Sequence, residues 1–346
     1  MSIDDLSESV PGGSPAGQLL SLIGGYWISQ AINVAAELGI ADLLGRKGRD
    51  IEDLARASNA HAPSLYRLMR ALASVGVFAE VAPRSFALAP MSVLLRDDTP
   101  GNLRAFARMH GDAWHWGCWG DALHTVRTGQ SAIAKREGAA HCFEYLANHP
   151  HSAQVFDAAM SGYSAHVCEA IIDAYDFTAA QCVIDIGGGT GMLLSSVLAS
   201  NARARGILFD RPEVLDRARP VLDDVGVAAR CTRVAGDLFG EIPGGGDVYL
   251  MSAVLHDWDD DDATRILAGV AAAMSRSARL LVVEHVLAPP NQPDHAKFID
   301  LEMLLITGGR ERSKEEYMTL LNSANLQCER VVPTEMPVSI LEARRH

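Results

Sequence analysis

The chain has 346 residues, more than one compact core usually contains, and this length predicts two domains. Its composition, 48% hydrophobic and 21% charged, is that of a folded globular protein and excludes wholesale disorder. The formal net charge of −13 argues against a surface that wraps nucleic acid or sits on anionic lipid.

The six cysteines and the amino terminus indicate the compartment. No two cysteines have C-x-x-C spacing, so they predict neither a zinc site nor a disulfide framework, and we expect reduced thiols and no metal ion. The first residues are acidic and polar, unlike a secretory signal. The apolar segment Leu19–Leu44 is interrupted by polar residues and glycines, so we expect it not to span a bilayer. Together these features predict a cytoplasmic protein.

The amino-terminal third is predicted to be mostly helical. Residues 1–15 predict a flexible tail, and residues 16–108 a helical domain with apolar residues at three- and four-residue steps. Within it, 51–58 and 62–75 predict two short helices, and 78–88 predicts a hairpin. This order of elements is typical of a winged helix.

A winged helix can bind DNA or join two subunits. The second helix offers only Arg67 and Arg70 to phosphates, inside an acidic protein, which counts against DNA. The apolar density of Leu19–Leu44 exceeds what one small domain needs and indicates a subunit interface. We therefore expect a dimerisation domain and a homodimer.

Residues 109–180 predict a helical connector between the two halves. Trp114, Trp116 and Trp119 cluster there, a Gly/Ala-containing loop is expected around 129–140, and helix continues over 143–174. Tryptophans are most often core residues, but connectors between domains are also where pockets form. The connector is therefore expected to contribute to a substrate pocket.

Residues 181–346 alternate strands and helices. Helical segments separate the predicted strands, which lie at 182–187, 204–210, 229–235, 247–255 and 278–287. A last helix is expected at 313–324, followed by a strand pair near 328–332 and 338–343. This rhythm predicts an α/β fold with a doubly wound, mainly parallel sheet, whose ligand binds beyond the carboxyl ends of the strands.

The first predicted strand leads into a glycine-rich loop, DIGGGTG, over 185–191. Glycines allow a ligand to approach the backbone closely, and the following helix offers unpaired N–H donors. Such a loop alone also fits a dinucleotide oxidoreductase. That rival predicts a spaced G-x-G-x-x-G pattern, whereas the run here is Gly-Gly-Gly-Thr-Gly.

Acidic residues end the successive strands around the same crevice. Asp185 precedes the glycines by two positions, where it could accept from a ligand ammonium. Asp210 is placed for a ribose diol, and Asp237 is followed by Leu238 and Phe239, which suit an adenine. This set favours S-adenosylmethionine over a dinucleotide.

Five motifs in order carry a family resemblance: DIGGGTG, FDRPEV, GDLF, LHDWDDDD and GGRER. They resemble the caffeic acid/flavonoid type of small-molecule O-methyltransferase, whose bacterial relatives act on phenazines, polyketides and other antibiotic intermediates. The resemblance covers essentially the whole chain. It implies a Rossmann-like methyltransferase domain, an amino-terminal dimerisation domain, S-adenosylmethionine as cofactor and an aromatic small molecule as substrate.

The resemblance also implies a cofactor site. Asp210 is expected to hold the ribose, Asp237 the adenine amine, and Trp258 to close over the adenine. Ser252 stands where the plant enzymes usually carry a lysine near the adenosine. The full set of expected cofactor residues is Asp185, Gly187, Gly189, Asp210, Asp237, Leu238, Phe239, Ser252, Trp258 and Ser164.

Methyl transfer from a sulfonium requires an aligned acceptor oxygen and removal of its proton. An imidazole suits a phenol at neutral pH, and His256 is expected at the carboxyl end of the fourth strand. The resemblance assigns Glu284, 28 residues later, and Glu311 as flanking carboxylates. A carboxylate beside an imidazole fixes its tautomer and stabilises the imidazolium.

By position within the matched helices, the acceptor pocket is expected to involve Trp116, Phe156, Met160 and Met303, although each equally fits core packing. Two further readings stay open at this point. The winged segment could belong to a DNA-binding regulator, and some relatives of this fold have been turned to decarboxylation or hydroxylation. The presence of His256 with both glutamates favours methyl transfer.

Overall fold

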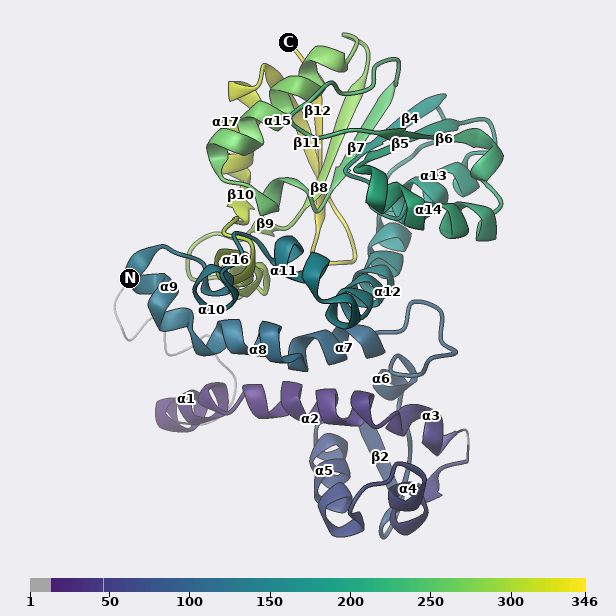
Figure 1. The fold of residues 1–346 in the computed structure, drawn as a ribbon, viewed down its shortest axis with the longest axis vertical. Coiled ribbons are helices and arrows are strands. Elements are labelled where there is room, and N and C mark those ends of the chain that lie inside the picture. Colours follow the sequence, from purple (N-terminus) through teal and green to yellow (C-terminus); the bar gives the residue numbers. More distant parts are fainter. Residues whose placement is uncertain (1–13, 46) are drawn as a thin grey trace. The chain divides into compact units, whose positions relative to one another are not determined.

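The computed structural model describes residues 14–45 and 47–346 (Figure 1). The described chain forms two compact units. The first comprises the residues up to Trp116 together with Gln154–Gly162, and the second comprises Gly117–Ala153 and Tyr163–His346. Most of the tail predicted at residues 1–15 lies outside the described residues. Its last two positions take part in the first helix, because the Ser14 hydroxyl accepts from the Gly17 N–H at 3.2 Å.

The first unit contains the predicted pair of short helices and hairpin. Strand β1 pairs with β3, and β3 pairs with β2, in an antiparallel three-stranded sheet. A core of residues such as Ile51, Met69 and Phe86 fills the space between helices and sheet. The elements are α1 (Pro15–Ile23), α2 (Tyr26–Glu37), α3 (Ile40–Leu44), β1 (Arg49–Asp50), α4 (Ile51–Ala57), α5 (Ala62–Ser74), β2 (Phe78–Ala82), β3 (Ser85–Leu88), α6 (Pro90–Val93), α7 (Arg104–Gly111) and α8 (Ala113–Gly120).

The apolar segment Leu19–Leu44 is divided among the helices α1, α2 and α3. Gly24 and Gly25 separate α1 from α2, and no residue of α1 is buried. By length and composition alone, Pro15–Glu37 is long and apolar enough to cross a membrane, despite the interruptions noted in the sequence. Only 17% of its most apolar window is buried within the chain. This segment therefore presents an apolar surface that the described residues leave uncovered.

The connector is more helical than the sequence indicated. The region around 129–140, expected as a loop, contains α10 (Ala132–Glu137), which begins where the Ser131 hydroxyl accepts from the Ala134 N–H at 3.4 Å. Pro150 begins the long helix α12 (Pro150–Ala174) and separates it from α11 (Cys142–Asn148), because proline suits the first turn of a helix. Helix α9 spans Ala122–Thr128.

The second unit is built on a seven-stranded sheet of order β11-β12-β8-β7-β4-β5-β6, in which β4 to β8 run parallel and β12 pairs antiparallel with both β8 and β11. This confirms the predicted doubly wound, mainly parallel fold. Its strands are β4 (Cys182–Ile186), β5 (Arg205–Asp210), β6 (Cys231–Ala235), β7 (Val248–Ser252), β8 (Arg279–Glu284), β11 (Leu326–Pro333) and β12 (Ser339–Arg345).

Helices cover both faces of this sheet (Figure 1). Successive residues of a strand point to opposite faces, so Val183 packs with α12, α13 and α14, whereas Ile184 packs with α15 and α17. The covering helices are α13 (Met192–Ser200), α14 (Pro212–Asp224), α15 (Asp260–Ala273) and α17 (Lys314–Ser323), with α16 (Ala296–Ile306), the 3₁₀ turns η2 (Ala228–Arg230) and η3 (Leu255–Asp257), and the short strands β9 (Val286–Leu287) and β10 (Arg312–Ser313).

The order of strands reverses between β4 and β7, so the carboxyl ends of these two strands flank a crevice. Strand β7, expected to reach residue 255, ends at Ser252 because Ala253 takes a positive φ of 53° and the chain turns into η3. His256 therefore lies on a tight turn just beyond the strand.

Candidate active site

The glycine loop joins β4 to α13 at the crevice. Gly189 has a φ of 59°, a conformation that side chains disfavour, and its N–H donates to Asp210 Oδ2 at 2.8 Å. At Gly188, a Cβ atom would lie 2.5 Å from the Asp185 carboxyl carbon. The glycines therefore let the loop lie directly on the buried acid and face the end of β5.

Asp185 lies inside the sheet beneath this loop, with an exposed fraction of 1%. Burial and the charge of Asp210 raise the pKa of Asp185 to about 7. Its Oδ2 atom has no hydrogen-bond partner among the described residues. A buried carboxyl group with a free oxygen is thus present below the glycines, at the place where the sequence predicted an acceptor.

The other two predicted acids follow neighbouring strands. Asp210 ends β5, whose last residue pairs with Ala235 of β6, and Asp237 follows β6. The Arg211 N–H donates to Asp210 Oδ1 at 2.7 Å, and the Phe239 N–H donates to Asp237 Oδ1 at 2.8 Å. These backbone contacts hold both carboxylates in fixed orientations along one edge of the sheet.

Flat side chains lie next to these acids. The rings of Phe239 and Trp258 meet edge to face with centroids 4.9 Å apart, and the Arg265 guanidinium lies 4.7 Å from the Phe239 ring centre. Leu238 is half-buried against the core. Of the remaining predicted cofactor residues, Ser252 is half-buried at the end of β7, Gly187 opens the loop, and Ser164 is half-buried on α12.

His256 is held between the two predicted carboxylates. Its Nδ1 atom lies 2.9 Å from Glu311 Oε1 and 3.5 Å from Glu284 Oε2. Both glutamate side chains are fully buried. Glu284 Oε1 also accepts from the N–H groups of Val254 and Leu255, at 3.0 and 2.8 Å. Glu284, at the end of β8, therefore fixes the turn that carries His256 as well as facing its ring.

Burial and charge oppose each other in this cluster. Burial is the largest single influence on His256 and disfavours its charged form, but the surrounding carboxylates, Glu284 foremost, outweigh it and raise the pKa of His256 to about 10. Burial also raises the pKa of Glu284 to about 7. For Glu311, hydrogen bonds from two histidines outweigh burial and lower the pKa to about 2. The surrounding carboxylates thus favour the protonated form of the His256 ring, and the two histidines favour the ionised form of Glu311.

The second of those histidines, His285, was missed in the sequence, although it directly follows Glu284. Its Nδ1 lies 3.2 Å from Glu311 Oε1, and its Nε2 lies 3.4 Å from the Tyr163 hydroxyl. His256, His285 and Glu311 also form a group whose donor atoms lie within 4.8 Å of one another, as metal ligands would. The two nitrogen–oxygen separations are those of hydrogen bonds from Nδ1–H groups to one carboxylate oxygen.

Two further residues missed in the sequence surround the turn of His256. Arg312, which directly follows Glu311, is fully buried and donates to the carbonyls of Leu255 and Trp258 at 2.9 and 2.8 Å. At Gly309, a Cβ atom would lie 2.0 Å from the His256 carbonyl oxygen. The GGRER segment thus shapes the turn from both sides.

The predicted acceptor residues belong to different compact units. Trp116, Phe156 and Met160 lie in the first unit, and Met303 lies in the second on α16. Trp116 is 40% exposed and lies 5.9 Å from the Tyr26 ring, and the other three are half-buried. Helix α16 ends at Ile306, with Thr307 as its C-cap. The acceptor residues therefore stay predictions.

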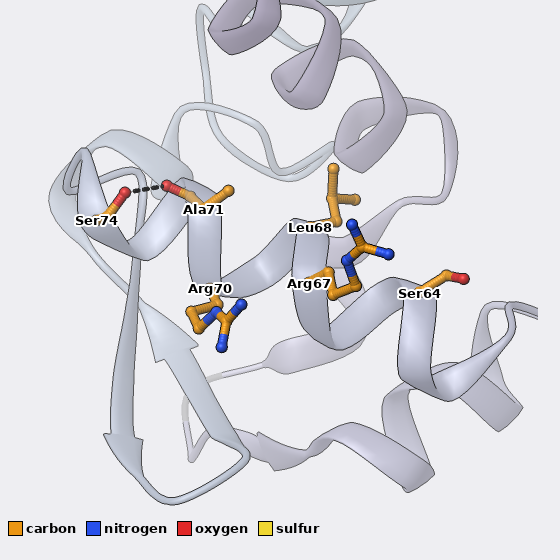
Figure 2. Close-up of a pocket in the computed structure, with 6 residues that line it drawn as sticks. All are labelled: Ser64, Arg67, Leu68, Arg70, Ala71 and Ser74. Atoms are coloured by element: carbon orange, nitrogen blue, oxygen red, sulfur yellow. Dashed lines mark hydrogen bonds between the residues drawn. The ribbon is translucent and has the colours of Figure 1, made fainter.

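A hollow on α5 lies far along the chain from these residues (Figure 2). It is lined by Ser64, Arg67, Leu68, Arg70, Ala71 and Ser74. Figure 2 shows the Ser74 hydroxyl bonded to the Ala71 carbonyl, and both arginines on the surface of the helix. This hollow contains no acid or imidazole and offers no group for proton transfer.

A doubly wound sheet with a glycine loop, acids at successive strand ends and a histidine between carboxylates is an arrangement that suits a nucleotide-like cofactor and proton transfer. Two family models match the chain: an O-methyltransferase domain at residues 119–327 and an O-methyltransferase dimerisation domain at residues 20–98. The chain therefore belongs to the O-methyltransferase family and is an enzyme of that class. The winged segment lies in the dimerisation match, which leaves the DNA-binding reading without support.

Curated relatives agree over nearly the full chain. The sequence is 46% identical to a phenazine O-methyltransferase of Lysobacter antibioticus, over 94% of this chain and 95% of that protein. It is 39% identical to the mitomycin biosynthesis 6-O-methyltransferase of Streptomyces lavendulae, over 94% and 93% of the two chains. These relatives confirm the resemblance to small-molecule O-methyltransferases.

Solved structures share the fold. The structure of LaPhzM has a TM-score of 0.89 and 45% identity, and the match covers 96% of this chain and all of that one. NcsB1, an O-methyltransferase from neocarzinostatin biosynthesis, was solved with S-adenosylmethionine and 2-hydroxy-5-methyl naphthoic acid. It has a TM-score of 0.75 and 33% identity, with 92% and 96% of the chains covered.

Proposed function

We propose that this enzyme methylates a phenolic hydroxyl of an aromatic small molecule in secondary metabolism, with S-adenosylmethionine as donor and His256 as general base. The observation that carries the proposal is the His256 Nδ1 atom placed between the buried carboxylates of Glu284 and Glu311. The relatives that act on phenazine and mitomycin intermediates support the substrate class. We propose a cytoplasmic location, since all six cysteines are free thiols, as in proteins of a reducing compartment.

The residues at the crevice fit the cofactor. When bound, S-adenosylmethionine supplies a methyl group on a positively charged sulfur. Gly187 and Gly189 offer close backbone approach, and Asp185 lies beneath them with a carboxyl oxygen free for a donor. Asp210 suits the ribose hydroxyls, and Asp237 with Leu238, Phe239 and Trp258 forms a polar and flat edge for the adenine. Ser252 and Ser164 complete the proposed set.

The chain's own chemistry is proton removal. With Nδ1–H directed to Glu311, the Nε2 atom of His256 is the position that holds the acceptor proton, either taken from a neutral phenol or already present on the ring when the acceptor is a phenolate. A pKa near 10 matches that of an ordinary phenol, so the proton passes between groups of similar basicity. Glu284 and Glu311 then stabilise the imidazolium. We propose that the connector helices contribute to the acceptor pocket. The side chains proposed to orient the acceptor ring are Trp116, Phe156, Met160 and Met303.

Transfer to a phenol is the direct test of this function. The full-length enzyme is incubated with methyl-labelled S-adenosylmethionine and a panel of hydroxyphenazines, hydroxynaphthoates and hydroxybenzoates, and products are identified by mass spectrometry. We expect an O-methyl ether from at least one scaffold. Consumption of the phenol by hydroxylation or decarboxylation without label transfer would instead favour a diverted reaction.

We further propose that the enzyme is a homodimer formed through α1 and α2. Seven of their large apolar side chains are at least 45% exposed and lie in or beside the matched dimerisation domain: Leu19, Leu20, Leu22, Ile23, Tyr26, Trp27 and Ile28. Such a contiguous apolar face marks an interface. The break between α1 and α2 at Gly24 and Gly25 favours a protein partner over a bilayer, which continuous helices span.

Sedimentation equilibrium at micromolar concentration is expected to give twice the chain mass of 37.1 kDa. Leu22→Asp is expected to give monomers, because a carboxylate in an apolar interface is costly to desolvate. Val126→Asp is the matched control, since Val126 is 71% exposed on α9 outside that face. A monomeric wild type, or one that sediments with phospholipid vesicles, would contradict the proposed dimer.

A further inference from the structure

A second imidazole, that of His285, lies within hydrogen-bond distance of Glu311, the buried carboxylate that orients the proposed base. Glu311 Oε1 lies 2.9 Å from His256 Nδ1 and 3.2 Å from His285 Nδ1, so one oxygen atom faces both rings. The side chain of His285 is 10% exposed and that of Glu311 is fully buried. Water therefore does not replace these contacts when one is lost, and each ring affects the other through Glu311.

The tautomers of the two rings follow from this geometry. A carboxylate oxygen accepts hydrogen bonds, so both Nδ1 atoms must carry a hydrogen. The Nε2 atom of a neutral His285 is then an acceptor, and the Tyr163 hydroxyl lies 3.4 Å from it. Burial raises the pKa of Tyr163 to about 12, so its hydroxyl keeps the proton that it directs at His285. A chain of contacts thus runs from Tyr163 through His285 and Glu311 to His256.

We propose that His285 is a positioning residue for methyl transfer, which fixes the Glu311 carboxylate and thereby the orientation and basicity of His256. This inference rests on the proposed role of His256 as the base. Tyr163 orients His285 in turn. Neither residue touches the reacting atoms in this account, and both act through Glu311.

The direction of the effect follows from charge sharing on Glu311. The hydrogen bond from His285 partly satisfies this carboxylate and so weakens its attraction for a proton on His256. Loss of the His285 donor leaves Glu311 a stronger partner for the imidazolium, which raises the pKa of His256. The other titratable or charged groups around the cluster stay unchanged: Glu284 on β8, Asp257 on η3, Asp300 on α16, Arg312 on β10, Tyr163 on α12, Tyr317 on α17, and His141 before α11.

The test compares two replacements of His285. His285→Phe keeps a ring but removes the donor, whereas His285→Asn places an amide N–H near the former Nδ1–H. The pH dependence of kcat/KM between pH 7 and 11 is measured with a phenol found to be methylated. The limb of this pH profile that is absent in His256→Gln is assigned to the titration of His256. Histidine ¹⁵N chemical shifts of the cofactor-free enzyme report the same titration without turnover.

For His285→Phe we expect kcat to fall about tenfold and the His256 titration to move upward by about one pH unit, the effect of one hydrogen bond to a charged group. His285→Asn is expected to lie closer to wild type in both respects. A uniform loss at all pH values with an unmoved titration, or an asparagine variant as impaired as phenylalanine, would overturn the inference.

Two outcomes separate this inference from other accounts. If His256→Gln is inactive but His285→Phe behaves as wild type, only the role of His285 fails. If His256→Gln is fully active, the proposed role of His256 as the base fails first, and the role of His285 fails with it. Removal of divalent cations with EDTA, followed by zinc addition, is expected to change neither rate nor titration. A reversible response would mean that His256, His285 and Glu311 hold a metal ion instead.

Discussion

Replacement of His256 by glutamine is expected to lower turnover by about 10²–10⁴-fold while S-adenosylmethionine binds with unchanged affinity. Glutamine preserves much of the side-chain volume but cannot take up the acceptor proton. The carboxylates that orient the ring are fully buried and remain in place, so the loss falls on the chemical step. Single-turnover kinetics measures the rate, and titration calorimetry measures cofactor affinity.

The pH profile distinguishes a proton-transfer role from a steric one. The pKa of His256 is raised to about 10, so below this pH the ring is an imidazolium. A phenol that ionises near neutrality then enters as phenolate beside that charge, which is equivalent in protons to a neutral phenol beside a neutral base. We expect kcat/KM of the wild type to rise as the phenol ionises, and to fall above pH 10. The fall should be absent in His256→Gln.

Asp210→Ala supplies the converse control. Its carboxylate accepts from the Gly189 N–H and faces the proposed ribose position, so its loss is expected to weaken cofactor binding by at least tenfold. Saturating cofactor should restore most of its turnover. If His256→Gln instead lost cofactor affinity and kept turnover, the ring would belong to the cofactor site and alignment alone would drive transfer.

The sequence was most informative where local pattern decides structure. Alternating apolar strands and helices predicted the sheet, because the period of apolar residues is set by the geometry of each element. Boundaries failed where a single backbone conformation decides them. Nothing in the pattern indicates that Ala253 takes a positive φ and ends β7 early. Likewise, Ser131 and a few alanines form α10 in a region that composition predicts as loop.

For the site, local sequence placed the acids near the crevice but did not pair them. His256 and Glu311 are 55 positions apart, and only the family resemblance associated them before the 2.9 Å contact was seen. His285 and Tyr163 were missed because their meaning depends on contacts across 26 and 122 positions. A histidine directly after a proposed catalytic glutamate is the one signal that could have indicated the first.

Arg312 is the residue whose loss should cost most in stability. Its guanidinium is fully buried and donates to Leu255 O and Trp258 O, the carbonyls that flank the turn of His256, and to Asp260 Oδ1 at 2.9 Å. Arg312→Met keeps the side-chain length but leaves buried carbonyls without a donor. We expect a free energy of unfolding lower by about 3–5 kcal/mol, the range for breaking a buried charge network.

Arg310→Met is the matched control, two positions away. Arg310 pairs with Asp260 and Glu316, but its side chain is 43% exposed, so these contacts are solvated and worth about 1 kcal/mol or less. Urea unfolding, monitored by tryptophan fluorescence, compares the stability of the two variants. The activity of Arg312→Met, measured at a temperature low enough for it to stay folded, shows whether the turn that carries His256 is intact. Arg312→Lys keeps the charge but cannot reach both carbonyls, so it should recover only part of the stability. Equal unfolding midpoints for Arg312→Met and Arg310→Met would mean that the buried guanidinium does not hold the catalytic turn.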